Sequence, residues 1–333
     1  MFRHLLVPLD GSRLAEAALP VAAYVARKLV STVTLLHVVE RHSPQEVHGD
    51  AHLTAPEQAA AYLDHVAARP ILSGLAVKQH VHTAAVDDVA RSIVEHGDEL
   101  APDLIVMCTH GSSGLRRWFY GTIAQQVIAL GTIPTLVVGS TGAKSAQPFV
   151  CRRMLVPIDG RPEHEQGLPI AIDLARACDA DLHLLMVVRT LSALAGQQAA
   201  SARLLPGTTV ELLNVTEDNA QVLLQQRVTQ AQAYGLAVTA EIRRGDPVRQ
   251  IVQATRAIEA DVIVLGTHGR VGMDALWAGS VVPRLSRDID KPLLLVPIKR
   301  MRIINRHYLG DPETVQAAEE AAARQLGSTR RMQ

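Results

Sequence analysis

The sequence predicts an α/β protein built from two tandem, doubly wound domains, each with a five-stranded parallel sheet. One observation is a repeat: residues 105–122 read IVMCTHGSSGLRRWFYGT, and residues 263–280 read IVLGTHGRVGMDALWAGS. A second is the pair VPLDG (7–11) and VPIDG (156–160). A third is that short apolar runs alternate with helical patterns, which indicates βαβ crossovers and a mostly parallel sheet.

The spacing of the two copies shows where they differ. Late positions of the repeat are 158 residues apart, as in His110 and His268 or Pro134 and Pro292, whereas the VPLDG and VPIDG segments are 149 apart. The second copy therefore contains nine additional residues between its early and late parts. We expect a first domain over 1–140, a second over 151–298 and a tail over 299–333.

The elements of the first copy follow from local patterns. Apolar runs predict strands at 3–9, 33–39, 76–83, 103–109 and 135–139. Helical spacing predicts helices after Ser12, around 57–68 and near 87–100. The polar, turn-rich segment 40–56 is expected to be a loop.

The second copy repeats this order. Strands are predicted at RMLVPID, DLHLLMVV, LAVTAEI, DVIVLGT and LLLVPI, with helices at 163–178, around 216–234 and from 247. Asp311-Pro312-Glu313 predicts the start of a helix in the tail. That helix either docks on its own domain, frays in solvent or binds a partner.

Composition excludes several functional classes. Lys plus Arg and Asp plus Glu both total 33 and aromatic residues are 3%, so neither nucleic acid nor a membrane surface is an expected partner. The apolar runs are far shorter than the roughly 20 residues of a membrane span. The N-terminal MFRHLLVPLDGS does not read as a signal peptide, and the three cysteines form no CxxC pair. We expect a cytoplasmic protein.

Residues near the strand ends could bind a phosphate-bearing ligand. In a parallel sheet, ligands lie beyond the carboxyl ends of the strands, where the strand order reverses. Gly279-Ser280 precedes a predicted helix whose free N–H groups favour phosphate, and Arg270 could add positive charge. Asp159 could accept hydrogen bonds from an adenine amino group or a ribose hydroxyl. Neither GxxxxGK[ST] nor GxGxxG occurs, so a Walker-type NTPase and a dinucleotide dehydrogenase are not supported.

These motifs resemble those of the universal stress protein family, in a tandem form covering about 2–139 and 152–298. The resemblance rests on a first strand ending in Pro-x-Asp-Gly, a His-Val-Val-like run and G-x-x-G-x9-G-[ST]. It implies a five-stranded, Rossmann-like fold that pairs through its last strands, here as an internal pseudo-dimer. It also implies ATP binding in members that carry the motif, whereas other members act through partners.

The resemblance assigns nucleotide contacts in both copies. In the second copy they are Pro157, Asp159, Val187, Leu265, Gly266, His268, Gly269, Arg270, Gly279, Ser280 and Val281. In the first copy they are Pro8, Asp10, Val38, His110, Gly111, Gly121, Thr122 and Ile123. The first copy departs from the motif because Cys108 replaces its first glycine, and because Asp87-Asp88-Val89 stands where the second copy has Gly245-Asp246-Pro247.

The function implied is a stress-response protein that binds ATP, ADP or AMP, with or without Mg²⁺, most of all in the second domain. Its role would be regulatory or protective, and the pair could assemble further into a homodimer. No nucleophile–base set is evident, so at most slow ATP hydrolysis is expected. The alternative is a nucleotide-free scaffold acting through domain pairing, the 40–56 loop or the tail helix. His48 and His52 have metal-like spacing, but exposed loop histidines are the preferred interpretation.

Overall fold

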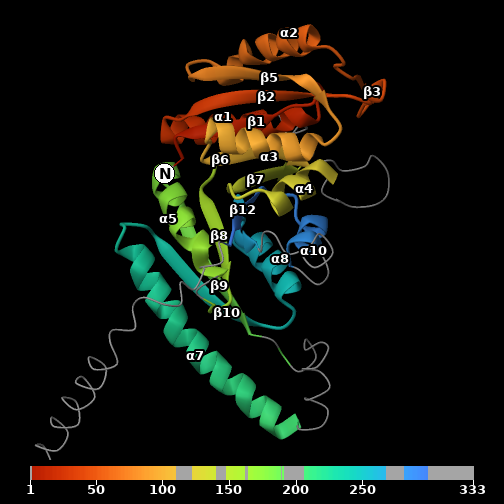
Figure 1. The fold of residues 1–333 in the computed structure, drawn as a ribbon. Coiled ribbons are helices and arrows are strands. Elements are labelled where there is room, and N and C mark those ends of the chain that lie inside the picture. Colours follow the sequence, from red (N-terminus) through yellow and green to blue (C-terminus); the bar gives the residue numbers. More distant parts are fainter. Residues whose placement is uncertain are drawn as a thin grey trace, which may run out of the picture. The chain divides into compact units, whose positions relative to one another are not determined.

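Ten strands form one mixed sheet in the computed structural model of the chain (Figure 1). The structure describes residues 2–109, 122–139, 148–161, 164–188, 190, 206–267 and 281–298. The strand order is β10-β9-β8-β11-β12-β7-β6-β1-β2-β5. The predicted α/β fold with two tandem parallel-sheet domains is thus confirmed. The tail over 299–333, with its predicted helix, lies outside the described residues.

The first domain contributes the half of the sheet from β7 to β5. Its strands are β1 (His4–Pro8), β2 (Thr32–Glu40), β5 (Val77–Val86), β6 (Leu104–Thr109) and β7 (Thr135–Gly139). Its helices are α1 (Leu19–Leu29), α2 (Pro56–Ala67), α3 (Val89–Leu100) and α4 (Thr122–Leu130), with short 3-10 turns η1 (Ala15–Ala18) and η2 (Pro70–Leu72). Two short strands, β3 (Glu46–Val47) and β4 (Asp50–Ala51), pair separately.

The second domain repeats this plan. Its strands are β8 (Arg153–Ile158), β9 (Asp181–Val188), β10 (Val238–Arg244), β11 (Val262–Thr267) and β12 (Leu293–Pro297). Its helices are α5 (Gly167–Cys178), α7 (Pro206–Gln232), α8 (Pro247–Ala257) and α10 (Val281–Asp288), and η4 (His164–Gln166) precedes α5. No helix in the described part of the chain is long and apolar enough to cross a membrane.

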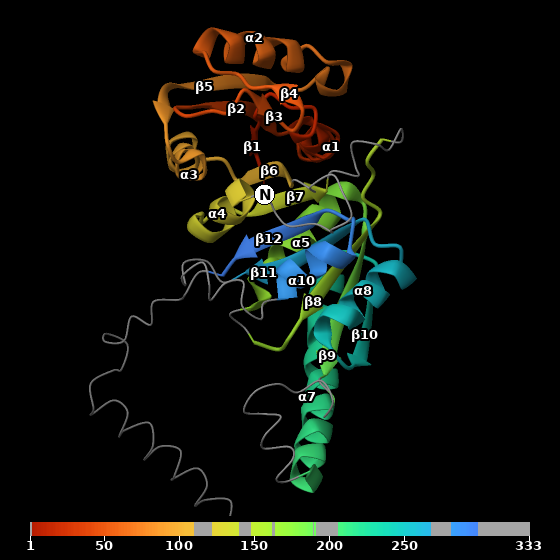
Figure 2. The same cartoon turned by 90° about the vertical axis from the view of Figure 1, so that its right-hand side faces the viewer.

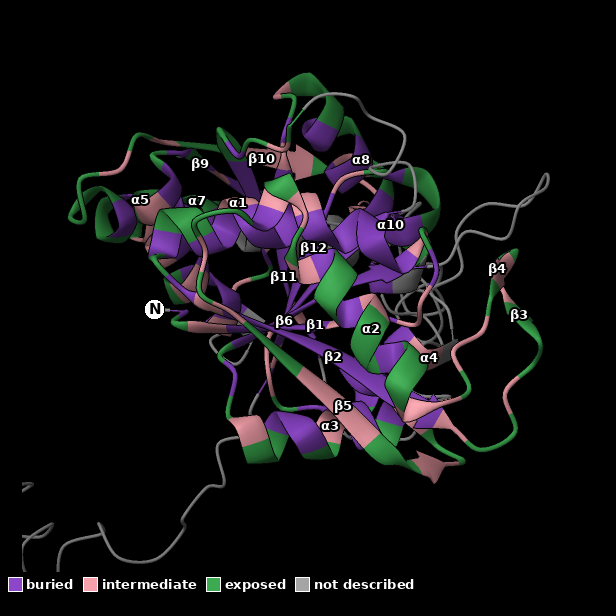
Figure 3. Ribbon diagram, turned by 90° about the horizontal axis from the view of Figure 1, so that it is seen from above, coloured by how far each residue is buried: buried purple, intermediate pink, exposed green. Residues whose placement is uncertain are grey.

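Helices cover both faces of the sheet, and the eight inner strands are mostly buried, whereas the edge strands β5 and β10 are partly exposed (Figure 3). One apolar cluster joins one face of the sheet to α1, α2, α5 and α7, and the other joins the opposite face to α3, α4, α8 and α10. This two-sided cover explains why strands such as β6 read as continuous apolar runs instead of alternating patterns.

The two domains meet through their last strands, β7 and β12, which pair antiparallel (Figure 2). Leu136 lies opposite Leu294, and both side chains are almost fully buried. All other strand pairs in the large sheet are parallel. The two domains therefore pair internally, as the resemblance implied, and neither leaves its last strand as an open edge.

Some element boundaries differ from those expected. The chain after Ser12 first forms the turn η1, and the α-helix starts only at Leu19 because Pro20 has no N–H to donate and fits the first helical turn. Helix α7 begins at Pro206, ten residues before the start expected at 216. The 40–56 segment, expected to be a loop, contains the β3–β4 hairpin.

A buried ion pair is repeated in the two domains. Arg69 donates two hydrogen bonds to Glu16, at 2.6 and 3.0 Å, and Arg227 donates one to Glu165 at 2.5 Å. The glutamates are 149 residues apart and the arginines 158, so both partners obey the offsets of the repeat. The carboxylates of Glu16 and Glu165 are almost fully buried. In each domain the pair ties the turn after the first strand to the segment that leads into the edge strand.

Val30 is a local exception to good backbone geometry. It ends α1 with φ of 53° and ψ of 48°, a left-handed conformation that disfavours β-branched residues, and it is 91% exposed. Replacing Val30 with glycine is expected to raise the free energy of unfolding by about 1 kcal/mol, as measured by urea denaturation.

Val222 provides the control for this substitution. It is an exposed valine within α7, where the same replacement is expected to lower stability by about 0.5 kcal/mol. Shifts of the same sign at both positions would rule out backbone strain at Val30.

Candidate functional site

The candidate site of the second domain lies where the strand order reverses. Strand β8 runs between β9 and β11, and all three are parallel, so their carboxyl ends meet at one edge of the sheet. Asp159 follows β8, Val187 is near the end of β9, and Gly266 is near the end of β11. Three of the residues expected to contact a nucleotide are therefore brought together at the position where parallel sheets bind ligands.

Asp159 is exposed at this edge, and the turn that carries it needs a glycine. Its carboxylate accepts a hydrogen bond from the backbone N–H of Arg161 at 3.1 Å. Gly160 has φ of +80°, and a Cβ there would come within 3.1 Å of the Leu223 side chain on α7. Positive φ and close packing both explain the glycine of the Pro-x-Asp-Gly motif.

Two helices begin near the same edge, because helices that connect parallel strands run back against them. Helix α8 is capped by Asp246, which accepts a hydrogen bond from the backbone N–H of Arg249 at 3.0 Å. Arg284 of α10 contacts both carboxylate oxygens of Asp246 at 3.2–3.3 Å, which ties α10 to α8. The start of α10 at Val281 thus presents a positive helix end beside the strand ends.

The equivalent edge of the first domain is covered by the chain itself. The His48 Nε2 atom in the β3–β4 hairpin lies 3.8 Å from a carboxylate oxygen of Asp10. Asp50 accepts a hydrogen bond from the backbone N–H of Arg13 at 3.0 Å and contacts the Arg13 Nε at 3.3 Å. A Cβ at Gly11 would come within 2.9 Å of Leu53. Asp10 is therefore less exposed than Asp159.

Two buried histidines lie beneath the hairpin. His37 is 1% exposed, and its Nδ1 lies 2.8 Å from the carbonyl oxygen of Leu9. Burial lowers the pKa of His37, which favours the neutral imidazole. The side chain of His52 is 7% exposed, and its Nε2 is 3.9 Å from Glu40. Within the part of the chain that the structure describes, Nε2 of His37 and Nδ1 of His52 make no hydrogen bond of good geometry. The expectation of an exposed loop histidine is therefore wrong for His52, because the hairpin folds back onto the strand ends.

Cys108, which replaces the first glycine of the motif, is a core residue. Its side chain is almost fully buried among apolar residues, and burial raises the pKa of its thiol to about 12. The structure therefore does not support a reactive thiolate at this position.

Some of the remaining candidate residues lie in the described part of the chain, and the others lie outside it. Leu265 and Val38 are buried core residues, Ile123 and Val281 pack against the core, and Pro8 and Pro157 lie within β1 and β8 next to the aspartates. Thr122 is the first residue of α4. Eight residues of the glycine-rich turns lie outside the described residues: His110, Gly111, Gly121, His268, Gly269, Arg270, Gly279 and Ser280.

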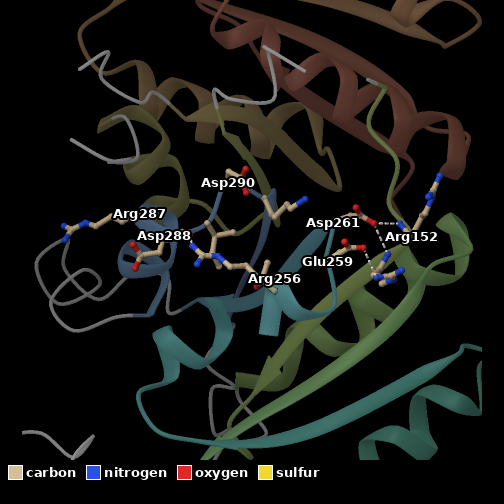
Figure 4. A pocket seen from close by; sticks show the side chains of 11 residues that line it. Arg152, Arg256, Glu259, Asp261, Arg287, Asp288 and Asp290 are labelled. Carbon is tan, nitrogen blue, oxygen red and sulfur yellow. Dashed lines mark hydrogen bonds and ion pairs between the residues drawn. The ribbon is translucent and has the colours of Figure 1, made fainter. Parts of the chain in front are cut away.

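A cavity of about 640 Å³ lies at the opposite, amino-terminal edge of the second domain's strands (Figure 4). Its charges are of both signs and contact one another: Arg153 lies 3.5 Å from Glu259 and also donates to the carbonyl of Ile258. Asp261 accepts hydrogen bonds from the backbone N–H groups of Arg152 and Arg153. Asp103 does the same for Arg3 and His4 in the first domain, so this aspartate has a structural role at the start of the first strand.

Sequence reasoning missed two residues that shape the two edges, Leu53 and Leu223. Each approaches the Pro-x-Asp-Gly region from elsewhere in its domain, and no local pattern marks it. Among the residues that the structure describes, no group of three or more His, Cys, Asp or Glu side chains is arranged to hold a metal ion.

Fold and site together define the class of protein: two doubly wound α/β domains in tandem, each with an aspartate after its first strand at the switch point. The model of the universal stress protein family matches residues 1–139 and 151–297. The chain belongs to the universal stress protein family.

One relative matches nearly the whole chain, and another matches about the length of one domain. A universal stress protein of Mycolicibacterium smegmatis is 24% identical over 309 residues, covering 88% of this chain and 96% of that protein. One of Synechocystis is 33% identical over 141 residues, covering 41% of this chain and 86% of that protein.

Solved structures share the fold. A functionally unknown protein from Pseudomonas aeruginosa PAO1 has a TM-score of 0.64 at 18% identity, covering 89% of this chain and 93% of that one. A universal stress protein from Archaeoglobus fulgidus has a TM-score of 0.61 at 17% identity, covering 89% of this chain and 97% of that one.

Proposed function

We propose that the protein is a cytoplasmic stress-response protein that binds an adenine nucleotide at the carboxyl edge of its second domain. The observation that carries the proposal is the exposed carboxylate of Asp159 at the switch point, between strands that carry Val187 and Gly266 near their carboxyl ends. A carboxylate at this position can accept hydrogen bonds from a ribose hydroxyl or an adenine amino group.

The phosphates would bind beyond the end of β11. The Gly266-to-Ser280 segment carries the full G-x-x-G-x9-G-S motif, and α10 starts directly after it. Backbone N–H groups at a helix start favour anions, with Mg²⁺ or Arg270 as further sources of positive charge. No base is assigned, so the nucleotide acts as a regulatory ligand that favours one state of the protein.

The second candidate function is a nucleotide-free scaffold. The covered carboxyl edge of the first domain favours a nucleotide-free state for that domain. His48 and Leu53 occupy the space over Asp10 and Gly11. A nucleotide would have to displace this hairpin from the first domain. The proposal therefore expects one nucleotide per chain, in the second domain.

The test is to purify the full chain without added nucleotide, denature it and identify the released small molecules by chromatography and mass spectrometry. We expect ATP, ADP or AMP at about one equivalent per chain. Two equivalents would show that the first domain also binds. No recovered nucleotide, together with no rise in melting temperature on adding ATP and Mg²⁺, would overturn the proposal in favour of the scaffold.

A further inference from the structure

Two of the three cysteines lie together at the boundary between the domains. Cys151 precedes β8 and Cys178 is the last residue of α5, and they are 2% and 4% exposed. The backbone N–H of Asp181 donates to the carbonyl of Arg152 at 2.8 Å, which holds the two segments side by side. The two cysteines are not joined as a disulfide, and each thiol is close enough to shift the pKa of the other.

The repeat shows that the fold does not require thiols here. Positions 149 residues earlier are occupied by Phe2 and Leu29, which line one small cavity together. The backbone is the same in both places: residues 30 and 179 are both left-handed, with φ of 53° and 56°. The first domain therefore fills with two apolar side chains the position where the second domain has two thiols.

The first domain supplies polar groups to this thiol pair. The Tyr24 hydroxyl on α1 donates to the carbonyl of Cys151 at 3.2 Å and contributes to lowering the pKa of Cys178. The Lys28 ammonium lies 5.9 Å from the centre of the Tyr24 ring, and Phe149 packs edge-on against that ring at 5.3 Å. The thiols of one domain and the hydroxyl and ammonium of the other thus form one cluster.

This cluster makes the two thiols unequal. The neighbouring Cys151 thiol, with smaller contributions from Tyr24 and Lys28, lowers the pKa of Cys178 even though burial opposes this. The Cys178 thiol, burial and the charge of Asp261 raise the pKa of Cys151. Burial raises the pKa of Tyr24 to about 12, so its hydroxyl keeps its proton and remains a donor. Of the two thiols, Cys178 is therefore the one whose surroundings favour the thiolate, and Cys151 lies on the adjacent segment.

We propose that Cys178 and Cys151 form a redox-active dithiol that reacts with small hydroperoxides and closes to a disulfide. The Cys178 thiolate attacks one peroxide oxygen, forming an S–O bond and breaking the O–O bond, and the displaced hydroxide takes up a proton to become water. The Cys151 sulfur then attacks the Cys178 sulfur, so that the S–S bond forms and the S–O bond breaks. The second hydroxide leaves as water with the Cys151 proton. Two thiols lose two electrons, and one hydrogen peroxide is reduced to two waters.

The disulfide would link the segment between the domains to α5. That segment carries Phe149 and Cys151, which contact Tyr24 of the first domain. The disulfide would thus form at the boundary of the paired domains, away from the carboxyl edge that carries Asp159. The proposal does not depend on nucleotide binding.

The test exposes the reduced full-length protein to a small molar excess of hydrogen peroxide. The reaction is stopped with catalase, and the protein is unfolded in excess iodoacetamide and weighed by mass spectrometry. We expect one alkylated cysteine, Cys108, and a peptide cross-link between Cys151 and Cys178 that dithiothreitol reverses. Cys108 is the internal control because it is equally buried but its pKa is raised by burial.

Two variants separate the roles of the thiols. In Cys151→Ser, dimedone should trap a sulfenic acid on Cys178, whereas in Cys178→Ser neither Cys151 nor Cys108 should be modified. Tyr24→Phe should slow cross-linking several-fold and shift its pH profile upward without preventing it. Three alkylated thiols after peroxide treatment, or equal oxidation of Cys108 and Cys178, would overturn the proposal.

Discussion

Replacing Arg69 with alanine is expected to lower the free energy of unfolding by about 3–5 kcal/mol, because the Glu16 carboxylate would remain buried without its counter-charge. Arg69 donates to both oxygens of Glu16, whose side chain is 8% exposed. Burial, with the neighbouring Glu16 charge, raises the pKa of Tyr62, so its hydroxyl stays protonated beside the carboxylate. Chemical denaturation of the full chain, followed by circular dichroism, measures the loss.

The Arg13–Asp50 pair is the matched control. Arg13 is 87% exposed, and replacing it with alanine is expected to change stability by about 0–1 kcal/mol. Replacing both Glu16 and Arg69 with methionine should restore most of the loss, because neither charge would then be buried alone. A loss below about 1 kcal/mol for Arg69→Ala would show that Glu16 is hydrated or protonated.

Replacing Asp159 with alanine is expected to weaken ATP binding about 10- to 100-fold, the equivalent of losing hydrogen bonds to a charged group worth about 1.5–3 kcal/mol. Asp159 is exposed at the switch point, and its carboxylate accepts a hydrogen bond from the backbone N–H of Arg161 at 3.1 Å. Isothermal titration with ATP and Mg²⁺ measures the affinity. Asp159→Asn should have an ATP affinity between those of the original protein and Asp159→Ala, because asparagine retains an acceptor oxygen.

The control is the equivalent substitution in the first domain. Asp10 accepts hydrogen bonds from the Ser12 backbone and hydroxyl at 2.9 and 2.6 Å and lies beneath His48. Asp10→Ala should therefore leave ATP affinity within about twofold of the original, a change below about 0.5 kcal/mol. Equal losses in both variants would contradict a site confined to the second domain, and no loss in either would contradict a role for the aspartate.

Local patterns predicted the architecture well because they report local physics. Apolar runs such as DLIVMCT mark strands covered on both faces, and the repeated Pro-x-Asp-Gly segments mark the ends of the first strands. Gly160 has the left-handed backbone and close packing that make glycine the favoured residue there. The position of Asp159 at the switch point could likewise be predicted, because the order of strands and helices dictates which strand ends meet.

By itself, then, the sequence determined the tandem α/β plan, the family and the edge of the sheet where a ligand is expected. Only the tertiary structure decided that a hairpin covers Asp10, that Glu16 meets Arg69 and that Cys151 meets Cys178 beside Tyr24. The physical reason is the sequence separation of the residues that interact. Strand and helix patterns arise from residues within a few positions of one another, whereas these contacts join residues far apart in sequence whose packing depends on the whole assembled sheet.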